Sequence, residues 1–228
     1  SFFSIFFSYN LFFSKNRNIN FFYEDLHLII YLIVILTIFF LFFSFNKDFS
    51  NNFLSIISSM SNIGFSLDIN QKNLNFLFLM LVIIGGSFFS TSSGLRFIKI
   101  YSLFNYSINQ ILSFSRPKNI FMNKLLFTKL NFNVDEINKY FLTILIFIFS
   151  LLILTSLLTI ISIDFESSFK LAILTLMNTV NSSSYGLENF NFYDLHFFTK
   201  NCLIFFMIIG RIELLTILLI MKKFLFKN

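Results

Sequence analysis

Long apolar runs determine how this chain is organised. Residues 26–45 and 140–163 are predominantly apolar and carry no formal charge, and residues 202–221 form a third run that contains two charges. Each run has about the 20 residues that a helix needs to cross a bilayer. A fourth apolar run ends at Ile84, is interrupted by GGSFFSTSSG at 85–94, and then resumes. The pattern predicts three continuous membrane spans and one span that is broken in the middle.

Two mildly apolar segments, Phe49–Met60 and Ser168–Val180, are too short to cross a bilayer. Each follows one span and precedes another, so we expect each to be a re-entrant helix. A polar strip follows each helix, SNIGF at 61–65 and NTVNSSSYG at 178–186. The order of span, short helix, strip and span therefore occurs twice. It predicts an all-α membrane protein built from two membrane–pore-loop–membrane repeats, of which the first has a broken second span.

The repeat divides the chain into four parts. Residues 1–25 are a cytoplasmic or interfacial lead-in, which we interpret as the tail of a preceding repeat, because the chain begins at Ser1 without the features of a signal peptide. Residues 26–104 form the first membrane–pore–membrane unit, 105–139 a cytoplasmic connector, and 140–228 the second unit.

Composition excludes other classes of protein. The chain is 56% hydrophobic and only 12% charged, whereas soluble domains are about a quarter charged. The single cysteine, Cys202, excludes a disulfide framework. Abundant Phe and the absence of Trp are typical of a bias toward AT-rich codons.

The basic residues predict an orientation. Twelve of the 17 Lys and Arg residues precede the first span, lie between the second and third, or follow the fourth; four lie on the other side. The positive-inside rule places both ends of the chain and residues 95–139 in the cytoplasm. We expect a multi-pass protein of the plasma membrane, which would be a bacterial inner membrane. Acidic residues flank the short helices on the outside, either as the rim of a cation pore or as ordinary loop charge.

The polar strips are candidates for binding an ion. Backbone carbonyls of non-helical strips at membrane depth replace the water shell of a cation, and the short helices direct their negative carboxy-terminal ends at it. The filter candidates are therefore Ser61, Asn62, Ile63, Gly64, Phe65, Thr179, Val180, Asn181 and Ser182. Two strips form half of a fourfold ring, so two further repeats are expected from missing amino-terminal sequence or from partner chains.

Three stretches resemble the Trk/Ktr/HKT family of potassium transporters, and within it the bacterial Trk membrane subunit. They are SMSNIGFSLDI (59–69) with IGGSFFSTSSGLRFIKI (84–100), the segment 116–139, and MIIGRIELLTILLI (207–220) with its Gly-Arg-Ile-Glu. The resemblance implies that the chain is the carboxy-terminal half of such a subunit, with repeats three and four. It also implies K+ uptake, a homodimer and a cytosolic nucleotide-binding regulatory subunit.

The resemblance assigns further residues. The filter glycine of repeat three corresponds to Gly64, whereas its counterpart in repeat four corresponds to Asn181, which departs from the family pattern. The interrupted segment is similar to the intramembrane gate of the family, which implies gate roles for Gly85, Gly86, Ser87, Ser90, Thr91 and Gly94. Phe88 and Phe89 replace small residues there.

Arg211 is a charge within a predicted span, where it is costly unless it faces protein or water. We expect it to contact the 87–93 loop and to latch the gate. The alternative is a structural polar contact without a role in permeation.

Other chemistry has little support in the sequence. No Ser/His/Asp arrangement, paired carboxylates, phosphate loop or metal motif is visible, so we expect no enzyme and no cofactor, with K+ only as the transported ion. The position of the basic 95–139 segment between spans favours membrane lipid over nucleic acid. Two other interpretations remain open: a hydrophobic subunit of a respiratory or other membrane complex, and a nonfunctional transporter fragment.

Overall fold

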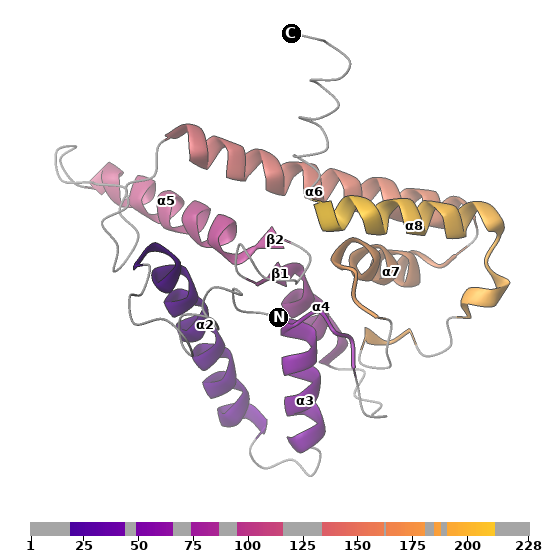
Figure 1. Cartoon of the computed structure of the whole chain (residues 1–228), viewed down its shortest axis with the longest axis horizontal. Helices are drawn as coiled ribbons and strands as arrows, with labels where there is room; N and C mark the ends of the chain where they lie inside the picture. The colour runs from indigo at the N-terminus through magenta and orange to yellow at the C-terminus, as the bar shows by residue number, and fades with distance from the viewer. Residues whose placement is uncertain are drawn as a thin grey trace, which may run out of the picture.

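The structure is a computed structural model that describes residues 19–43, 49–65, 74–86, 95–115, 134–161, 163–180, 185–187 and 191–212. The described part of the chain is mostly helical (Figure 1). Its elements, in chain order, are α2 (Ile19–Phe43), α3 (Phe49–Met60), α4 (Asn75–Ile83), β1 (Ile84–Gly85), β2 (Leu95–Arg96), α5 (Phe97–Ser115), α6 (Val134–Ile160), α7 (Phe165–Met177), the 3-10 helix η4 (Phe192–Asp194) and α8 (Phe197–Ile212).

The longest helix is α6, with 27 residues. Within the described ranges, its segment Asp135–Ile160 is the one helix whose length and composition would allow it to cross a membrane. The apolar part of α2, Leu26–Leu41, is shorter. Most residues of α6 are not buried, and large apolar side chains project from it: Phe141, Leu142, Ile148, Phe149, Leu152, Ile153 and Ile160.

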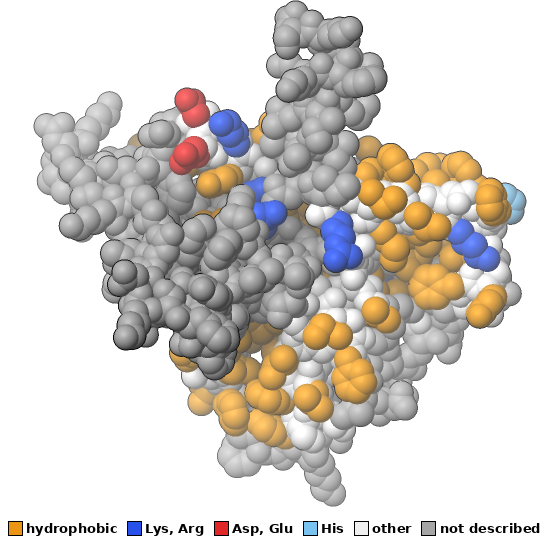
Figure 2. Space-filling model, viewed as in Figure 1, with side chains coloured by type: hydrophobic (Ala, Val, Ile, Leu, Met, Phe, Trp, Pro, Cys, Tyr) orange, Lys and Arg blue, Asp and Glu red, His pale blue; other side chains and the backbone are white. Residues whose placement is uncertain are grey.

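Hydrophobic side chains cover much of the described surface on the face drawn in Figure 2. Acidic side chains on this face gather at one end, over the beginning of α6, where the first turn contains Asp135 and Glu136. A monomeric soluble protein rarely exposes so large an apolar area. The surface therefore agrees with the composition in indicating an apolar environment.

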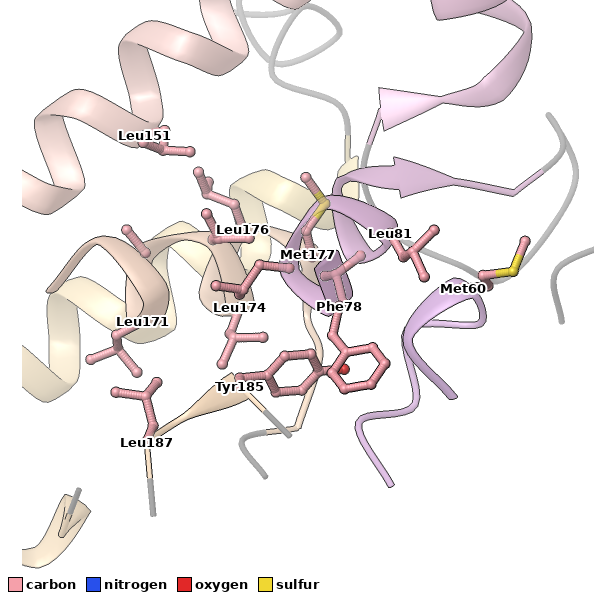
Figure 3. Packing of buried hydrophobic residues seen from close by; sticks show 14 of the residues in the cluster. Met60, Phe78, Leu81, Leu151, Leu171, Leu174, Leu176, Met177, Tyr185 and Leu187 are labelled. Atoms are coloured by element: carbon pink, nitrogen blue, oxygen red, sulfur yellow. The ribbon is translucent and has the colours of Figure 1, made fainter. Parts of the chain in front are cut away.

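Helix α7 lies at the centre of the packing. It contacts α6, α8 and α4, and every residue from Leu171 to Met177 is buried. Its 13 residues span about 20 Å, which is shorter than the bilayer core of about 30 Å. The seven consecutive buried residues show that protein encloses the second half of α7 on all sides. The surrounding helices provide that enclosure, and α6 contributes the fully buried Leu154 and Leu158. Leu151, also of α6, is labelled in Figure 3.

The chain is interrupted between α4 and α5. Strands β1 and β2 pair in parallel, with Ile84 beside Leu95 and Gly85 beside Arg96. The backbone N–H of Phe97 also donates to the carbonyl of Gly86 over 3.3 Å. These bonds hold the two ends of the intervening segment together, and the segment itself, residues 87–94, lies outside the described residues.

Helix α5 continues from this junction to Ser115, past the predicted unit boundary at residue 104. It packs against α6 and places its aromatic rings against α2. The ring centroids of His27 and Tyr101 lie 4.9 Å apart, and those of Tyr31 and Phe97 lie 5.1 Å apart. The aromatic rings thus join α2 to the helix that follows the interruption.

Helices α7 and α8 approach each other at a glycine. A Cβ atom built on Gly210 would lie 2.0 Å from the backbone oxygen of Leu176 and 2.8 Å from its carbonyl carbon. No side chain fits there, because the obstructing atoms belong to the backbone of α7. Asn178 adds a hydrogen bond across the same junction, from its side-chain Nδ2 to the carbonyl oxygen of Met207 over 2.9 Å.

Replacing Gly210 by Ala is therefore expected to separate α7 from α8 and to destabilise the protein by about 1–3 kcal/mol, as overpacking does. The measurement is the midpoint of thermal unfolding of the protein in detergent. Ile208→Ala is the matched control, because Ile208 lies on the same helix with 53% of its surface exposed. Equal midpoints for the two variants would contradict the close approach.

Candidate functional site

The candidate site begins at the carboxy-terminal end of α3, where the helix stops at a left-handed residue. Asn62 has a φ of 55° and directs its N–H to the carbonyl of Ser59 over 3.2 Å. The next N–H, that of Ile63, reaches the carbonyl of Ser58 over 3.0 Å. These two bonds define a Schellman motif, which satisfies carbonyls that the end of a helix leaves unpaired.

Helix α7 ends in the same way. Asn178 has a φ of 52°, and its N–H donates to the carbonyl of Thr175 over 3.1 Å. The N–H of Thr179 donates to the carbonyl of Leu174 over 3.0 Å. Because Asn tolerates the left-handed conformation better than most residues, it suits both positions. The two asparagines lie 116 positions apart in the sequence.

The same spacing of 116 positions relates further contacts in the two helices. The hydroxyl of Ser59 donates to the carbonyl of Ser55 over 2.7 Å, and that of Thr175 to the carbonyl of Leu171 over 2.6 Å. Stacked phenylalanine rings occur at the beginning of each helix, with centroids 6.3 Å and 6.2 Å apart; the pairs are Phe49 with Phe53 and Phe165 with Phe169. The two short helices therefore share one register of local contacts.

This register aligns Gly64 with Val180. The resemblance to the potassium transporter family implied that Asn181 takes the position of the glycine, and Asn181 and Ser182 lie outside the described residues. Gly64 has a φ of 79°, whereas Val180 is not among the described residues with a left-handed backbone. The two strips thus leave their helices through similar turns and then follow different backbone paths.

The two strips meet directly. A Cβ atom built on Gly64 would lie 2.2 Å from the backbone oxygen of Val180 and 2.9 Å from its carbonyl carbon and its nitrogen. Only glycine permits this approach, and its left-handed φ is a second reason for glycine at position 64. The segments following α3 and α7, far apart in the sequence, therefore bring their backbones into contact.

The residues of the two strips differ in exposure. Gly64 and Thr179 are buried, whereas Ile63, Phe65 and Val180 each expose more than half of their surface. The hydroxyl of Thr179 is buried and has no hydrogen-bond partner among the described residues. Close to the contact of Gly64 with the Val180 backbone, the described part of the second strip thus carries one buried hydroxyl without a partner.

Tyr185 joins the second strip to the first short helix. Its side chain is 1% exposed, and its hydroxyl oxygen lies 3.3 Å from the hydroxyl oxygen of Ser59. Figure 3 shows Tyr185 within the buried cluster, together with Phe78 of α4 and Met177 of α7. The sequence analysis did not single out this tyrosine, because no local pattern reveals a contact across 126 positions.

Only part of the expected gate is described. Gly85 and Gly86 are buried, whereas Ser87, Ser90, Thr91 and Gly94 lie outside the described residues. Arg211 is exposed in the last turn of α8, so its predicted contact with residues 87–93 stays a prediction.

Lys99 of α5, which the charge count placed with the cytoplasmic basic residues, is buried with 6% of its surface exposed.

A charged pair lies at the beginning of α7. The side-chain nitrogen of Lys170 donates to an oxygen of Glu166 over 2.5 Å, one helical turn away. This hydrogen bond, together with the positive charge of Lys170, lowers the pKa of the Glu166 carboxyl from its ordinary value of 4.5. Lys170 is 14% exposed and Glu166 79% exposed, so water screens the pair. The Lys170 nitrogen also lies 3.1 Å from the position that a Cβ on Gly186 would take, close to the second strip.

Comparison with solved structures gives a clear likeness. The crystal structure of the potassium transporter TrkH from Vibrio parahaemolyticus matches with a TM-score of 0.67 and 19% sequence identity, over 88% of this chain. The fold is similar to that of a potassium transporter. The match covers 42% of the TrkH chain, so this chain spans less than half of that protein. No family model matches the chain, and no curated protein matches it.

The pair of Glu166 and Lys170 gives a pH dependence with a definite sign. Because the folded state lowers the pKa of Glu166, the stabilisation is present above the ordinary carboxyl pKa and is lost as the pH falls through the folded value. We expect the thermal unfolding midpoint of the protein to exceed that of Glu166→Gln slightly near pH 7, and the difference to shrink and then vanish as the pH falls below the ordinary carboxyl pKa and through the lowered folded value. Asp164→Asn is the control, because the Asp164 side chain makes no capping hydrogen bond. A difference that is constant with pH would refute the assignment.

Proposed function

We propose that this chain forms two pore-loop units of a membrane protein that takes up K+. The observation that carries the proposal is the contact between the backbones of Gly64 and Val180 at the ends of two short helices. The likeness of the fold to TrkH supports it. Passage of an ion, and not catalysis, is the function, and K+ is the transported species.

The proposed ion ligands are backbone oxygens of the two strips, residues 61–65 and 179–182. Non-helical backbone is tolerated at membrane depth where protein encloses it or where it lines a hydrated path, and each described strip contains a buried residue beside exposed ones, Gly64 in the first and Thr179 in the second. Each short helix ends at its strip, so the partial negative charge of its last turn favours a cation there. A dehydrated K+ would exchange its water shell for these oxygens.

The two units are proposed to be related as repeats. The shared left-handed asparagine, the matched hydroxyl bonds and the stacked phenylalanines all recur 116 positions apart. Two units complete only half of a ring, and the chain spans 42% of the TrkH chain. We therefore propose that two further units precede these, that the complete protein is a homodimer bound by a cytosolic nucleotide-binding subunit, and that the plasma membrane lipids surround it with both ends of this segment in the cytoplasm.

Gating is proposed to occur at residues 85–94, with Arg211 as the latch. The pairing of β1 with β2 supports this role, because it brings the two ends of the segment together inside the protein, next to the buried Gly85 and Gly86. Arg211 lies one residue after Gly210, where α8 is closely packed on α7. A cation at that position, on the cytoplasmic side of the strips, would oppose the passage of K+ whenever it faces the path.

Cells that lack their own K+ uptake systems provide the test of the proposed function. We expect the complete gene product to restore growth at low external K+, and Gly64→Ala to reduce the rate of K+ uptake at least tenfold, because the added Cβ would collide with the backbone of Val180. Ser50→Ala, an exposed position at the beginning of α3, is the control. Failure of the wild-type protein to restore growth, despite normal insertion in the membrane, would exclude the proposal.

The role of Arg211 has a separate test. We expect Arg211→Ala to increase the rate of K+ uptake severalfold, because it removes a positive barrier and a latch from the path. Lys200→Gln, which removes a cation from the other end of α8, should leave the rate unchanged. Unchanged or abolished uptake by correctly inserted Arg211→Ala protein would eliminate the latch.

A further inference from the structure

We propose that Tyr185 is a positioning residue that fixes the first polar strip relative to the second and thereby sets the selectivity for K+ over Na+. The inference rests on the proposed function, since it assigns a role within the same site. It is carried by the hydrogen bond between the hydroxyl groups of Tyr185 and Ser59, which joins the segment after α7 to the end of α3.

The direction of this bond follows from the other contacts of Ser59. The hydroxyl hydrogen of Ser59 is donated to the carbonyl of Ser55 over 2.7 Å. Ser59 therefore has only lone pairs left for Tyr185, and the Tyr185 hydroxyl is the donor. A chain of two hydrogen bonds runs from the tyrosine through the serine into the backbone of α3.

Ser59 transmits the position of Tyr185 to the strip. Its carbonyl oxygen accepts the N–H of Asn62, which is the bond that ends α3 in a left-handed turn. Gly64 follows two residues later and contacts the backbone of Val180. The same serine thus holds the tyrosine with its side chain and the beginning of the strip with its backbone.

The surroundings of Tyr185 make it a rigid support. The side chain is 1% exposed, and it belongs to the cluster that includes Phe78, Met177 and Leu187 (Figure 3). A buried ring has one accessible position, so its hydroxyl is held at a fixed point. Phenylalanine would fill nearly the same volume, so what tyrosine adds is the hydrogen bond to α3. With phenylalanine at position 185, the buried Ser59 hydroxyl would lose the donor that it accepts from.

A shift of the strip alters selectivity more than it alters stability. K+ and Na+ differ in the distance at which oxygens coordinate them, so displacement of the Ile63 and Gly64 carbonyls relative to the second strip favours one ion over the other. The counterpart of Ser59 in the second unit, 116 positions later, is Thr175. Its hydroxyl donates to the carbonyl of Leu171, as that of Ser59 donates to the carbonyl of Ser55. The tyrosine thus supports α3 from the opposite unit, in addition to the contacts within each helix.

The test is a double-mutant cycle in the complete protein. K+ and Na+ uptake are measured in the wild type, Tyr185→Phe, Ser59→Ala and the double variant, each normalised to the amount of protein in the membrane. We expect each single variant to lower the ratio of K+ to Na+ uptake by about fivefold, the effect of one hydrogen bond, and the double variant to lower it no further. Ser59→Thr, which keeps the hydroxyl, should retain most of the ratio, and Tyr193→Phe, at a position 90% exposed, should retain all of it.

The outcomes distinguish failure of the proposed function from failure of the positioning role of Tyr185. A wild-type protein without K+ uptake refutes the proposed function itself. A wild-type protein that takes up K+ while Tyr185→Phe keeps the normal ratio refutes only the positioning role. Equal losses of K+ and Na+ uptake, or additive effects of the two single variants, show that Tyr185 supports the fold without setting selectivity, and they also overturn the inference.

Discussion

The ends of two short helices are the constraint on which this structure depends. A helix that stops inside a protein leaves carbonyl groups unpaired, and burial of such groups is costly unless they find partners. Helices α3 and α7 both meet this demand with an asparagine in the left-handed conformation and two backbone bonds to the preceding turn. The turn also redirects the chain, so that each strip leaves its helix at a defined angle. The position of the strips is therefore a consequence of how the helices end.

Close approach of backbones is the second requirement, and glycine meets it at two places. Gly64 allows the first strip to contact the backbone of Val180, and Gly210 allows α8 to contact the backbone of α7 at Leu176. Both contacts lie within a few residues of the carboxy-terminal end of α7, the helix with the most complete burial. Close packing there leaves little room for adjustment, because protein interiors are dense and resist deformation. The proposed filter is thus held from two sides, by α3 through Tyr185 and by α8 through Asn178.

The sequence predicted those features that local patterns determine. The helix at Phe49–Met60 occurs with the predicted bounds, α7 begins three residues before the predicted Ser168, and α4 ends where the apolar run gives way to glycines. Contacts between residues far apart in the sequence could not be predicted from local patterns. The bond of Tyr185 to Ser59 joins residues 126 positions apart. Likewise, nothing in the sequence around Lys99 indicates that its side chain is buried. The alignment of Gly64 with Val180 was also missed, because the hydrogen bonds that end each helix define it, and those depend on backbone conformation.

Helices α4 and α8 meet the same three residues, Ile-Ile-Gly, with different outcomes. Ile83, Ile84 and Gly85 end α4 and begin β1, whereas Ile208, Ile209 and Gly210 continue within α8. The packing gives a reason, because Leu176 approaches Gly210 so closely that α8 is held against α7 through this sequence. In the first unit a second glycine, Gly86, follows, and its carbonyl accepts the N–H of Phe97 from beyond the interruption. The same three residues therefore end a helix at α4 and lie inside a helix at α8, and the close contact of Gly210 with α7 accounts for the difference.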